Sequence, residues 1–176
     1  MYACKNLWEV NACHDYLYPM EFKELFAQFA QPGVVEYISL RRKRAEPVEV
    51  VDKIMAIEQK GLEGDRYKNS GGPRQVTLIQ REHIDSIAAF LNKEKIDPSL
   101  LRRNIVVRGI NLLALKEKQF NIGEAVLEYS GDCHPCSRME ENLGNGGYNA
   151  MRGLGGITAR VIRSGTITVG DTVVPI

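Results

Sequence analysis

From residue 33 onward the sequence is a series of short apolar and β-branched segments, separated by glycine, proline and other turn-forming residues. Short strands divided by such turns are typical of sandwiches and barrels, and the helix–strand alternation is too irregular for a doubly wound sheet. The predicted fold is therefore mainly β, a β-barrel with a few peripheral α-helices. The expected strands are 34–41, 50–58, 76–79, 104–107, 125–129, 158–162, 166–169 and 172–174, with 158–162 and 166–169 paired as a hairpin.

A smaller number of segments carry helical signals. From Pro19 onward, apolar residues recur at i, i+3, i+4 and i+7, a stripe that must cover something apolar: Phe22, Leu25, Phe26 and Phe29. Helical spacing recurs over 84–91, Asp97-Pro98 is a good helix start, and 137–143 should form a short helix ended by Gly144. We expect residues 1–32 to form an N-terminal arm and helix, and 33–176 to form one domain.

The composition narrows the class of protein. The chain has 176 residues, a length that fits one domain. Its net charge is +1 with 26% charged residues, so there is no overall positive potential that would attract nucleic acid or an anionic membrane. Four cysteines are too few for a disulfide scaffold. No stretch resembles a signal peptide or is apolar for long enough to span a bilayer. We expect a cytoplasmic protein with reduced thiols and no nucleic-acid or membrane partner.

The two thiols of Cys133-His134-Pro135-Cys136 are the strongest candidates for chemistry. An expected strand precedes them and a short helix follows, and unpaired N–H groups and the helix dipole at such a junction favour a thiolate. A thiolate attacks electrophiles, carries sulfane sulfur and binds soft metals. The flanking glycine, aspartate, proline and arginine residues are poor core neighbours, so we predict Cys136 and Cys133 as catalytic residues. His134 could be a general base or metal ligand, or equally an exposed and idle residue.

A structural zinc site is disfavoured. Cys4, Cys13 and His14 could join the two later cysteines around a metal, but the nine-residue step from Cys4 to Cys13 lacks the usual close ligand spacing.

Three groups of basic residues are candidates for anion binding. Residues 41–44 (Arg-Arg-Lys-Arg) form either a phosphate or nucleic-acid patch or, as we favour, the solvated tip of a hairpin. Arg102-Arg103-Asn104 lies either at the rim of a buried strand or at an ordinary basic helix C-terminus. The glycine-dense stretch 144–156, with Arg152, Arg160 and Arg163, is either a flexible anion-binding loop beside the thiols or a mobile surface loop.

Taken together, these pieces resemble the MOSC family, named for the C-terminal domain of molybdenum cofactor sulfurases. The resemblance runs from about Gly33 to Val174. Its pieces, in family order, are Gly61-Leu62-Glu63-Gly64-Asp65-Arg66, Arg102-Arg103-Asn104-Ile105-Val106-Val107, Pro135-Cys136, and Gly155-Gly156-Ile157-Thr158-Ala159-Arg160-Val161 followed by Gly165 and Gly170-Asp171. The cysteine motif and the Gly-Gly-Tyr-Asn-Ala-Met-Arg stretch after it further resemble a bacterial branch of stand-alone MOSC proteins.

The resemblance implies a MOSC-type β-barrel with one functional cysteine, Cys136, which in some relatives coordinates the metal of the molybdenum cofactor (molybdopterin) and in others is proposed to carry sulfur. The Arg-x-Asn pattern that related reductases place at the cofactor phosphate maps onto Arg102 and Asn104, and Arg66 and Arg160 are further cofactor-binding candidates. Active members reduce N-hydroxylated compounds, including amidoximes and hydroxylated purine bases. The implied partners are thus a small-molecule substrate and an electron-donor protein or a sulfur-donor desulfurase.

Two departures and two alternatives accompany this resemblance. Residues 1–32 are expected to supply only an arm and a helix in place of the N-terminal β domain of the mitochondrial amidoxime-reducing proteins. Cys133 is an additional thiol that could resolve Cys136 as a disulfide.

The first alternative is therefore a thiol–disulfide protein that uses Cys133 and Cys136, although the strand and long-helix alternation of a thioredoxin-like fold is missing. The second is a non-enzymatic adaptor that delivers sulfur or cofactor to another enzyme.

Overall fold

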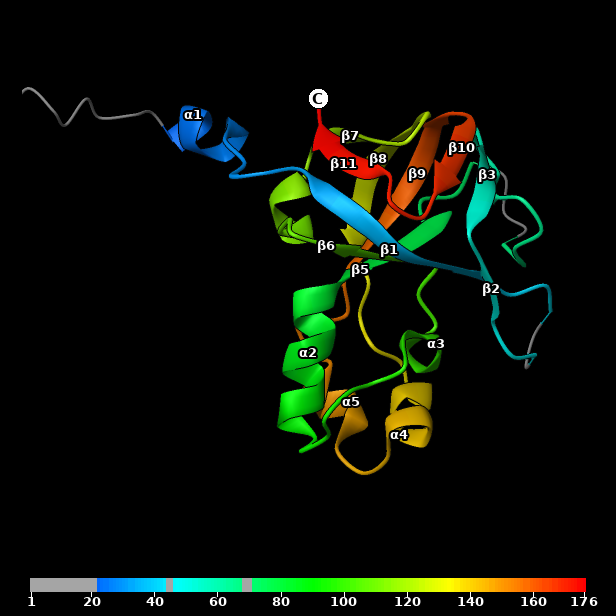
Figure 1. Cartoon of the computed structure of the whole chain (residues 1–176), viewed down its shortest axis with the longest axis vertical. Coiled ribbons are helices and arrows are strands. Elements are labelled where there is room, and N and C mark those ends of the chain that lie inside the picture. The colour runs from blue at the N-terminus through cyan, green and yellow to red at the C-terminus, as the bar shows by residue number, and fades with distance from the viewer. Residues whose placement is uncertain (1–21, 44–45, 68–70) are drawn as a thin grey trace, which may run out of the picture.

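A closed β-barrel forms the centre of the computed structural model, which describes residues 22–43, 46–67 and 71–176 (Figure 1). The strands of its main sheet are β1 (Gly33–Leu40), β2 (Glu49–Val51), β5 (Val76–Gln80), β6 (Ile105–Arg108), β7 (Gln119–Ile122), β8 (Ala125–Asp132), β9 (Ile157–Arg163) and β11 (Thr172–Pro175). They follow the order β11-β7-β8-β9-β5-β6-β1-β2, and pairing of β1 with β11 closes the first seven into a barrel. Only β5 and β6 run parallel among these described neighbours, so the barrel is mixed. The prediction of a mainly β barrel is confirmed.

A second sheet of three strands has the order β10-β3-β4, with β3 at Lys53–Ile57, β4 at Gly61–Leu62 and β10 at Gly165–Thr168. Two predictions are wrong here. The expected strand 50–58 is divided at Asp52 between β2 and β3, which belong to different sheets. The expected hairpin of β9 with β10 does not form, because β10 pairs with β3 while β9 pairs with β8 and β5.

The physical reason for the missing hairpin lies at Ser164, the single residue between β9 and β10. One residue is too short for a tight antiparallel turn, which needs two. The chain instead changes sheets there, and the Ser164 hydroxyl accepts a hydrogen bond from the Glu58 N–H at 2.8 Å. Gly165 then lies so close to the neighbouring backbone that an added Cβ would be 2.4 Å from the carbonyl carbon of Glu124.

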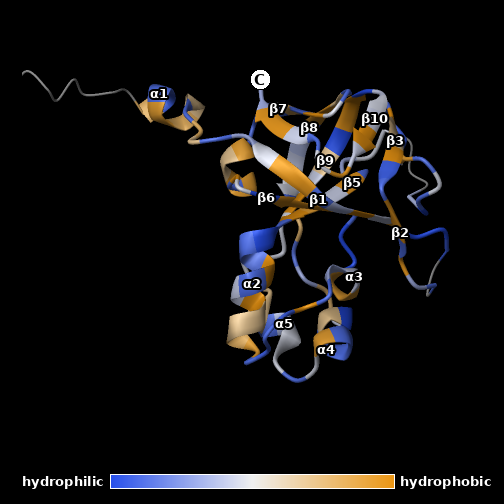
Figure 2. Ribbon diagram, in the orientation of Figure 1, coloured by the Kyte–Doolittle hydropathy of each residue, from blue (hydrophilic) through white to orange (hydrophobic). Residues whose placement is uncertain are grey.

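Alternation along the strands decides which residues fill the barrel and which face outward. Val76 and Leu78 of β5 belong to the interior cluster, as do Ile157 and Ala159 of β9. The residue between the first two, Thr77, therefore points to the outer surface of the barrel. Figure 2 shows the apolar residues concentrated on the barrel strands.

Helices gather at one end of the barrel (Figure 1): α2 (Arg81–Phe90), α3 (Pro98–Leu101), α4 (Arg138–Leu143) and α5 (Gly147–Ala150). A short 3₁₀ helix, η2 (Leu112–Leu115), lies between β6 and β7 in the chain. A second apolar cluster joins Ile79 of β5 and Val106 of β6 to the buried faces of α2, α4 and α5. The predicted helix starting at Asp97-Pro98 is confirmed, because the Asp97 side chain caps α3 by accepting from the Ser99 N–H at 2.9 Å.

The first helix, α1 (Phe22–Ala27), forms as predicted, but its apolar stripe does not cover a core. Phe22 is 77% exposed and Phe26 67% exposed, and only Phe29, beyond the helix, packs against the barrel interior. The reason is position, because α1 extends sideways from the start of β1 and away from the barrel (Figure 1). No helix in the described ranges is long and apolar enough to cross a lipid bilayer.

Candidate functional site

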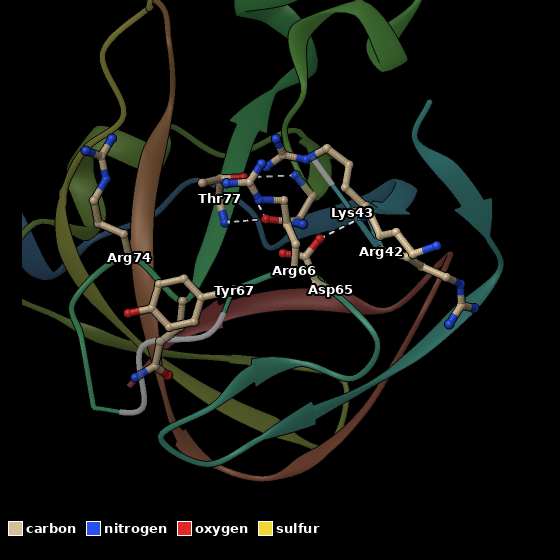
Figure 3. A pocket seen from close by; sticks show the side chains of 10 residues that line it. Arg42, Lys43, Asp65, Arg66, Tyr67, Arg74 and Thr77 are labelled. Carbon is tan, nitrogen blue, oxygen red and sulfur yellow. Dashed lines mark hydrogen bonds between the residues drawn. The ribbon is translucent and has the colours of Figure 1, made fainter. Parts of the chain in front are cut away.

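A pocket of about 540 Å³ lies beside the outer face of β5 and the β1–β2 loop (Figure 3). We call it the arginine pocket. Five of its lining residues are cationic and one is acidic; the full set is Arg41, Arg42, Lys43, Asp65, Arg66, Tyr67, Arg74, Gln75, Thr77 and Asn104. Figure 3 shows Asp65 and Arg66 near the middle, Arg42 and Lys43 on one side and Arg74 on the opposite side. A hollow with this charge balance suits an anion.

The prediction of a turn at 61–66 is right only in part, because Gly61–Leu62 form β4 and residues 63–66 make the turn; this segment builds one wall of the arginine pocket. Gly61 and Gly64 adopt φ values of +96° and +77°, which side chains with a Cβ rarely reach. The turn is fixed to the end of β1 by two hydrogen bonds: the Arg41 N–H donates to an Asp65 carboxylate oxygen at 2.7 Å, and the Arg66 N–H donates to the Arg41 carbonyl at 2.6 Å. These bonds bring Arg41 and Arg66 to the same wall.

The residues at 41–43 show that the hairpin prediction was right and its solvated-tip interpretation was incomplete. β1 and β2 pair as the two arms of the hairpin, yet all three basic residues line the arginine pocket. Arg42 and Lys43 pair with Glu49 and Glu46 at 2.7 and 3.5 Å. Arg41 is half-buried, and its pKa is lowered by burial and by the nearby charge of Arg102.

Arg102 extends the positive charge from the pocket toward the cysteine motif. Burial lowers the pKa of its guanidinium, and the charges of Arg138 and Arg66 lower it further, whereas Cys136 acts in the opposite direction. In the described part of the chain, the guanidinium groups of Arg41, Arg66 and Arg102 have neither an ion-pair nor a hydrogen-bond partner. The Asp65 carboxylate acts in the opposite direction on the Arg41 pKa, so the positive charge of this cluster is only partly balanced, and the excess favours an anion.

The backbone at Arg102 is itself unusual. Arg102 caps the C-terminus of α3 with φ 58° and ψ 36°, the left-handed conformation that glycine or asparagine normally occupies at this position. A residue with a Cβ is strained in this conformation, so the arginine at this position costs stability relative to glycine.

The two predicted catalytic thiols have different environments. Cys136 is exposed, Cys133 is buried at 4% exposure, and both are free thiols. Cys133 is held by its backbone N–H, which donates to the Gly156 carbonyl at 2.8 Å. His134, between them, is exposed. The thiol open to a reactant is therefore that of Cys136, which is within electrostatic range of Arg102.

Asn104, one of the predicted cofactor-binding residues, lines the arginine pocket, and its side chain also forms hydrogen bonds within the fold. Its amide oxygen accepts from both the N–H and the hydroxyl of Thr77, at 3.0 and 2.7 Å. Its amide nitrogen donates to the Ser39 carbonyl at 3.2 Å. These bonds tie β1, β5 and the start of β6 together, so only the remaining amide N–H of Asn104 is available to a ligand.

Arg160, the fourth predicted cofactor-binding residue, does not line the arginine pocket. Its Nη2 atom forms an ion pair with Glu128 at 2.9 Å, across the β8–β9 ladder in which these two residues are directly opposite. Of the predicted site residues, Arg66 and Asn104 line the arginine pocket, whereas Arg102, Cys136, Cys133 and Arg160 do not. Arg102 is within electrostatic range of both Arg66 and Cys136.

The glycine-dense stretch 144–156, predicted to be a loop, is mostly turns but also contains a short helix. Residues 147–150 form α5, and the Glu140 carboxylate accepts from the N–H groups of Gly146 and Tyr148 at 2.7 and 2.9 Å. Gly155 permits close packing against the cysteine loop, because a Cβ there would lie 2.1 Å from the Cys133 carbonyl oxygen.

Comparison with known proteins agrees with this geometry. The sequence profile of the MOSC domain matches residues 65–174. The chain belongs to the MOSC family. No curated protein sequence matches it.

Solved MOSC-like structures share the fold. YuaD from Bacillus subtilis superposes with a TM-score of 0.70 at 20% identity, over 81% of this chain and 94% of that one. YiiM from Escherichia coli gives 0.62 at 21% identity, over 81% and 69%, and YiiM from Geobacillus stearothermophilus gives 0.67 at 17% identity, over 82% and 75%. At these identities the likeness supports the MOSC barrel and its arrangement of strands.

Several residues of this MOSC domain were not predicted as site residues. The basic run Arg41, Arg42 and Lys43 is expected from the sequence to be a solvated hairpin tip. Its approach to Arg66 depends on the hydrogen bonds between Arg41 and the Asp65–Arg66 turn. Tyr67 and Arg74 follow no pattern that points to a site. The only sequence signal available was the basic run itself, directly after an apolar strand.

No three His, Cys, Asp or Glu side chains converge on a possible metal position in the described ranges. The zinc alternative involved Cys4, Cys13 and His14, which lie outside the described residues. A pterin dithiolene supplies sulfur ligands of its own, and its phosphate suits the arginine pocket, so the residues present fit the molybdenum cofactor.

Proposed function

We propose that this MOSC protein binds the molybdenum cofactor, with the Cys136 thiolate as the protein's ligand to the metal and the arginine pocket as the site of the cofactor phosphate. One observation carries the proposal: the exposed thiol of Cys136 is within electrostatic range of Arg102, and Arg102 is in turn within range of Arg66 and Arg41 at the arginine pocket. In the described residues, none of these three guanidinium groups forms an ion pair. Soft thiolates bind molybdenum, and arginine forks match phosphate oxygens.

Each residue has a distinct role in this proposal. Arg66 and Arg102 neutralise the phosphate, and half-buried Arg41 adds charge from the pocket wall. Asn104 contributes one amide N–H. Asp65 does not oppose the anion strongly, because one of its carboxylate oxygens already accepts from the Arg41 N–H.

The reaction class follows from the family. When bound, the cofactor supplies two-electron reduction, in which two electrons and two protons convert an N–OH group to N–H and water. The substrate is thus an N-hydroxylated small molecule, and the electrons come from a donor protein. The protein's own contribution is to hold the anionic end of the cofactor and to leave the face of Cys136 open to solvent and substrate.

A sulfur-carrying role uses the same thiol. In that version Cys136 accepts a sulfane sulfur from a donor desulfurase and holds it as a persulfide beside Arg102, whose charge stabilises the persulfide anion. In the thiol–disulfide alternative, the exposed Cys136 thiolate would attack the partner's disulfide, and the buried Cys133 thiol would displace the partner from the mixed disulfide. Burial of Cys133 is compatible with that role, so the Cys133→Ser variant below decides between the two.

The test compares the purified full-length chain from cells that make the molybdenum cofactor and from cells that do not. Molybdenum is measured by elemental analysis, and intact mass detects an added sulfur atom. We expect molybdenum only in the first preparation, its loss in Cys136→Ser and its retention in Cys133→Ser. Arg66→Met should reduce the molybdenum content, whereas Arg160→Met, outside the pocket, should not. Wild-type protein without molybdenum but with added sulfur would favour the carrier, and equal molybdenum in Cys136→Ser would refute ligation.

A further inference from the structure

A buried arginine lies behind the cysteine motif, outside the arginine pocket. Arg103 is 7% exposed, and its guanidinium donates hydrogen bonds to backbone carbonyls from three separate segments. Nε donates to Gly155 at 2.7 Å, Nη1 donates to Leu101 at 3.1 Å, and Nη2 donates to Cys133 at 3.1 Å and, more weakly, to His134 at 3.5 Å.

These contacts bring together the end of α3, the cysteine motif and the last turn before β9. Only the arginine side chain has a rigid planar fork with five N–H donors, which is why a lysine cannot bond all three segments at once. The backbone of Arg103 is fixed as well, because the Ser39 hydroxyl donates to its carbonyl at 3.0 Å.

The charge of Arg103 is not balanced by a carboxylate, since all of its acceptors in the described residues are neutral carbonyls. Burial lowers its pKa, while the charges of Cys133 and Cys136 act in the opposite direction, which places both sulfur atoms within its electrostatic range. Hydrogen bonds from a charged donor are about twice as strong as neutral ones, so this fork holds the motif firmly.

The motif is consequently held at one end and open at the other. The carbonyl of Cys133 is bonded to Arg103 and its N–H to the Gly156 carbonyl, whereas Cys136, three residues later, is exposed. We infer that Arg103 is the positioning residue of the site: it keeps Cys133 buried and thereby presents Cys136 alone at the surface beside Arg102. The inference rests on the proposed function only in treating Cys136 as the working thiol.

The experiment measures alkylation of the folded, cofactor-free chain by iodoacetamide, with peptide mass spectrometry to separate the two cysteines. In the wild type we expect Cys136 to react and Cys133 to be protected. In Arg103→Met the rate at Cys133 should rise by about tenfold or more, because the loss of charge-assisted bonds favours local opening by at least that factor. Arg103→Lys keeps the charge but not the fork, is expected to fold, and should also raise the Cys133 rate.

Arg81→Met is the matched control. Arg81 forms a partly buried ion pair with Glu36 at 2.7 Å, so its loss should lower the melting temperature without changing the ratio of the two alkylation rates. Continued protection of Cys133 in both Arg103 variants would overturn the inference, and so would an equal change of the ratio in Arg81→Met. Because the measurement needs no cofactor, a chain that shows this pattern but never contains molybdenum would refute the proposed function alone.

Discussion

Replacing Arg102 with glycine should stabilise the fold while it removes anion binding. Arg102 has φ 58° at the C-terminal cap of α3, where a residue with a Cβ costs about 1–2 kcal/mol relative to glycine. Glycine adds about 0.5–1 kcal/mol of unfolded-state entropy, which offsets part of this gain. The substitution also relieves repulsion from Arg138 and Arg66, which lower the pKa of Arg102. We expect a net gain of about 0.5–1 kcal/mol, or about 1–4 °C in melting temperature for a chain of this size.

The same variant should bind phosphate at least about tenfold more weakly, because a charge-assisted hydrogen bond contributes about 1.5–3 kcal/mol. Melting temperature is measured by calorimetry and phosphate affinity by titration calorimetry on the cofactor-free chain. Glu117→Gly is the matched control, because Glu117 has φ 62° and is exposed on the 3₁₀-helix side of the barrel. It should gain stability similarly and keep phosphate affinity. A lower melting temperature for Arg102→Gly together with a higher one for Glu117→Gly would show that the Arg102 side chain stabilises the fold. An unchanged phosphate affinity in Arg102→Gly would show that Arg102 does not bind the anion.

Three further perturbations follow from the contacts described above. Burial lowers the pKa of His83 below its usual 6.5, so the unfolded chain takes up a proton more readily than the folded one. The contribution of His83 to stability is therefore complete above pH 6.5 and is lost as the pH falls below it. His83→Gln should reduce this dependence of the melting temperature on pH between pH 5 and 8. Gly155→Ala should cost about 1–3 kcal/mol by collision with the Cys133 carbonyl, whereas Gly153→Ala, with open space around it but φ +77°, should cost only about 1 kcal/mol in chemical denaturation. Glu140→Gln should weaken its bonds to Gly146 and Tyr148, and amide hydrogen exchange at these two positions should become faster.

The parts of the fold that depend on local chemistry could be predicted from the sequence. The Asp97-Pro98 helix start, the turn at 63–66 and the barrel strands each follow from a dihedral preference, a cap or a period of two. The pairing of strands could not be predicted in the same way. The single residue Ser164 sends β10 to another sheet, and this depends on which partner strand is free, a property of the whole barrel.

Arg160 shows the same limit within the candidate site. Ala159 and Val161 point into the barrel, so alternation correctly places Arg160 on the outside. Whether an outward arginine faces a pocket or a carboxylate is decided by register, and here Glu128 is directly opposite. The sequence shows that an arginine faces outward at position 160, but it does not show that Glu128 forms an ion pair with it.

The Arg102-Arg103-Asn104 run shows how a single backbone angle separates the roles of adjacent residues. Arg102 and Arg103 are chemically identical in the sequence, yet one is beside the exposed thiol and the other is buried behind the motif. The left-handed conformation of Arg102 ends α3 and reverses the direction of the chain, so that Arg103 can bond inward to Leu101 and Cys133 while Arg102 remains outside. A positive φ at a residue other than glycine is not predictable from the run itself. The division between an outward arginine, proposed to bind an anion, and a buried arginine, proposed to position the motif, therefore arises from the fold and not from the run of residues itself.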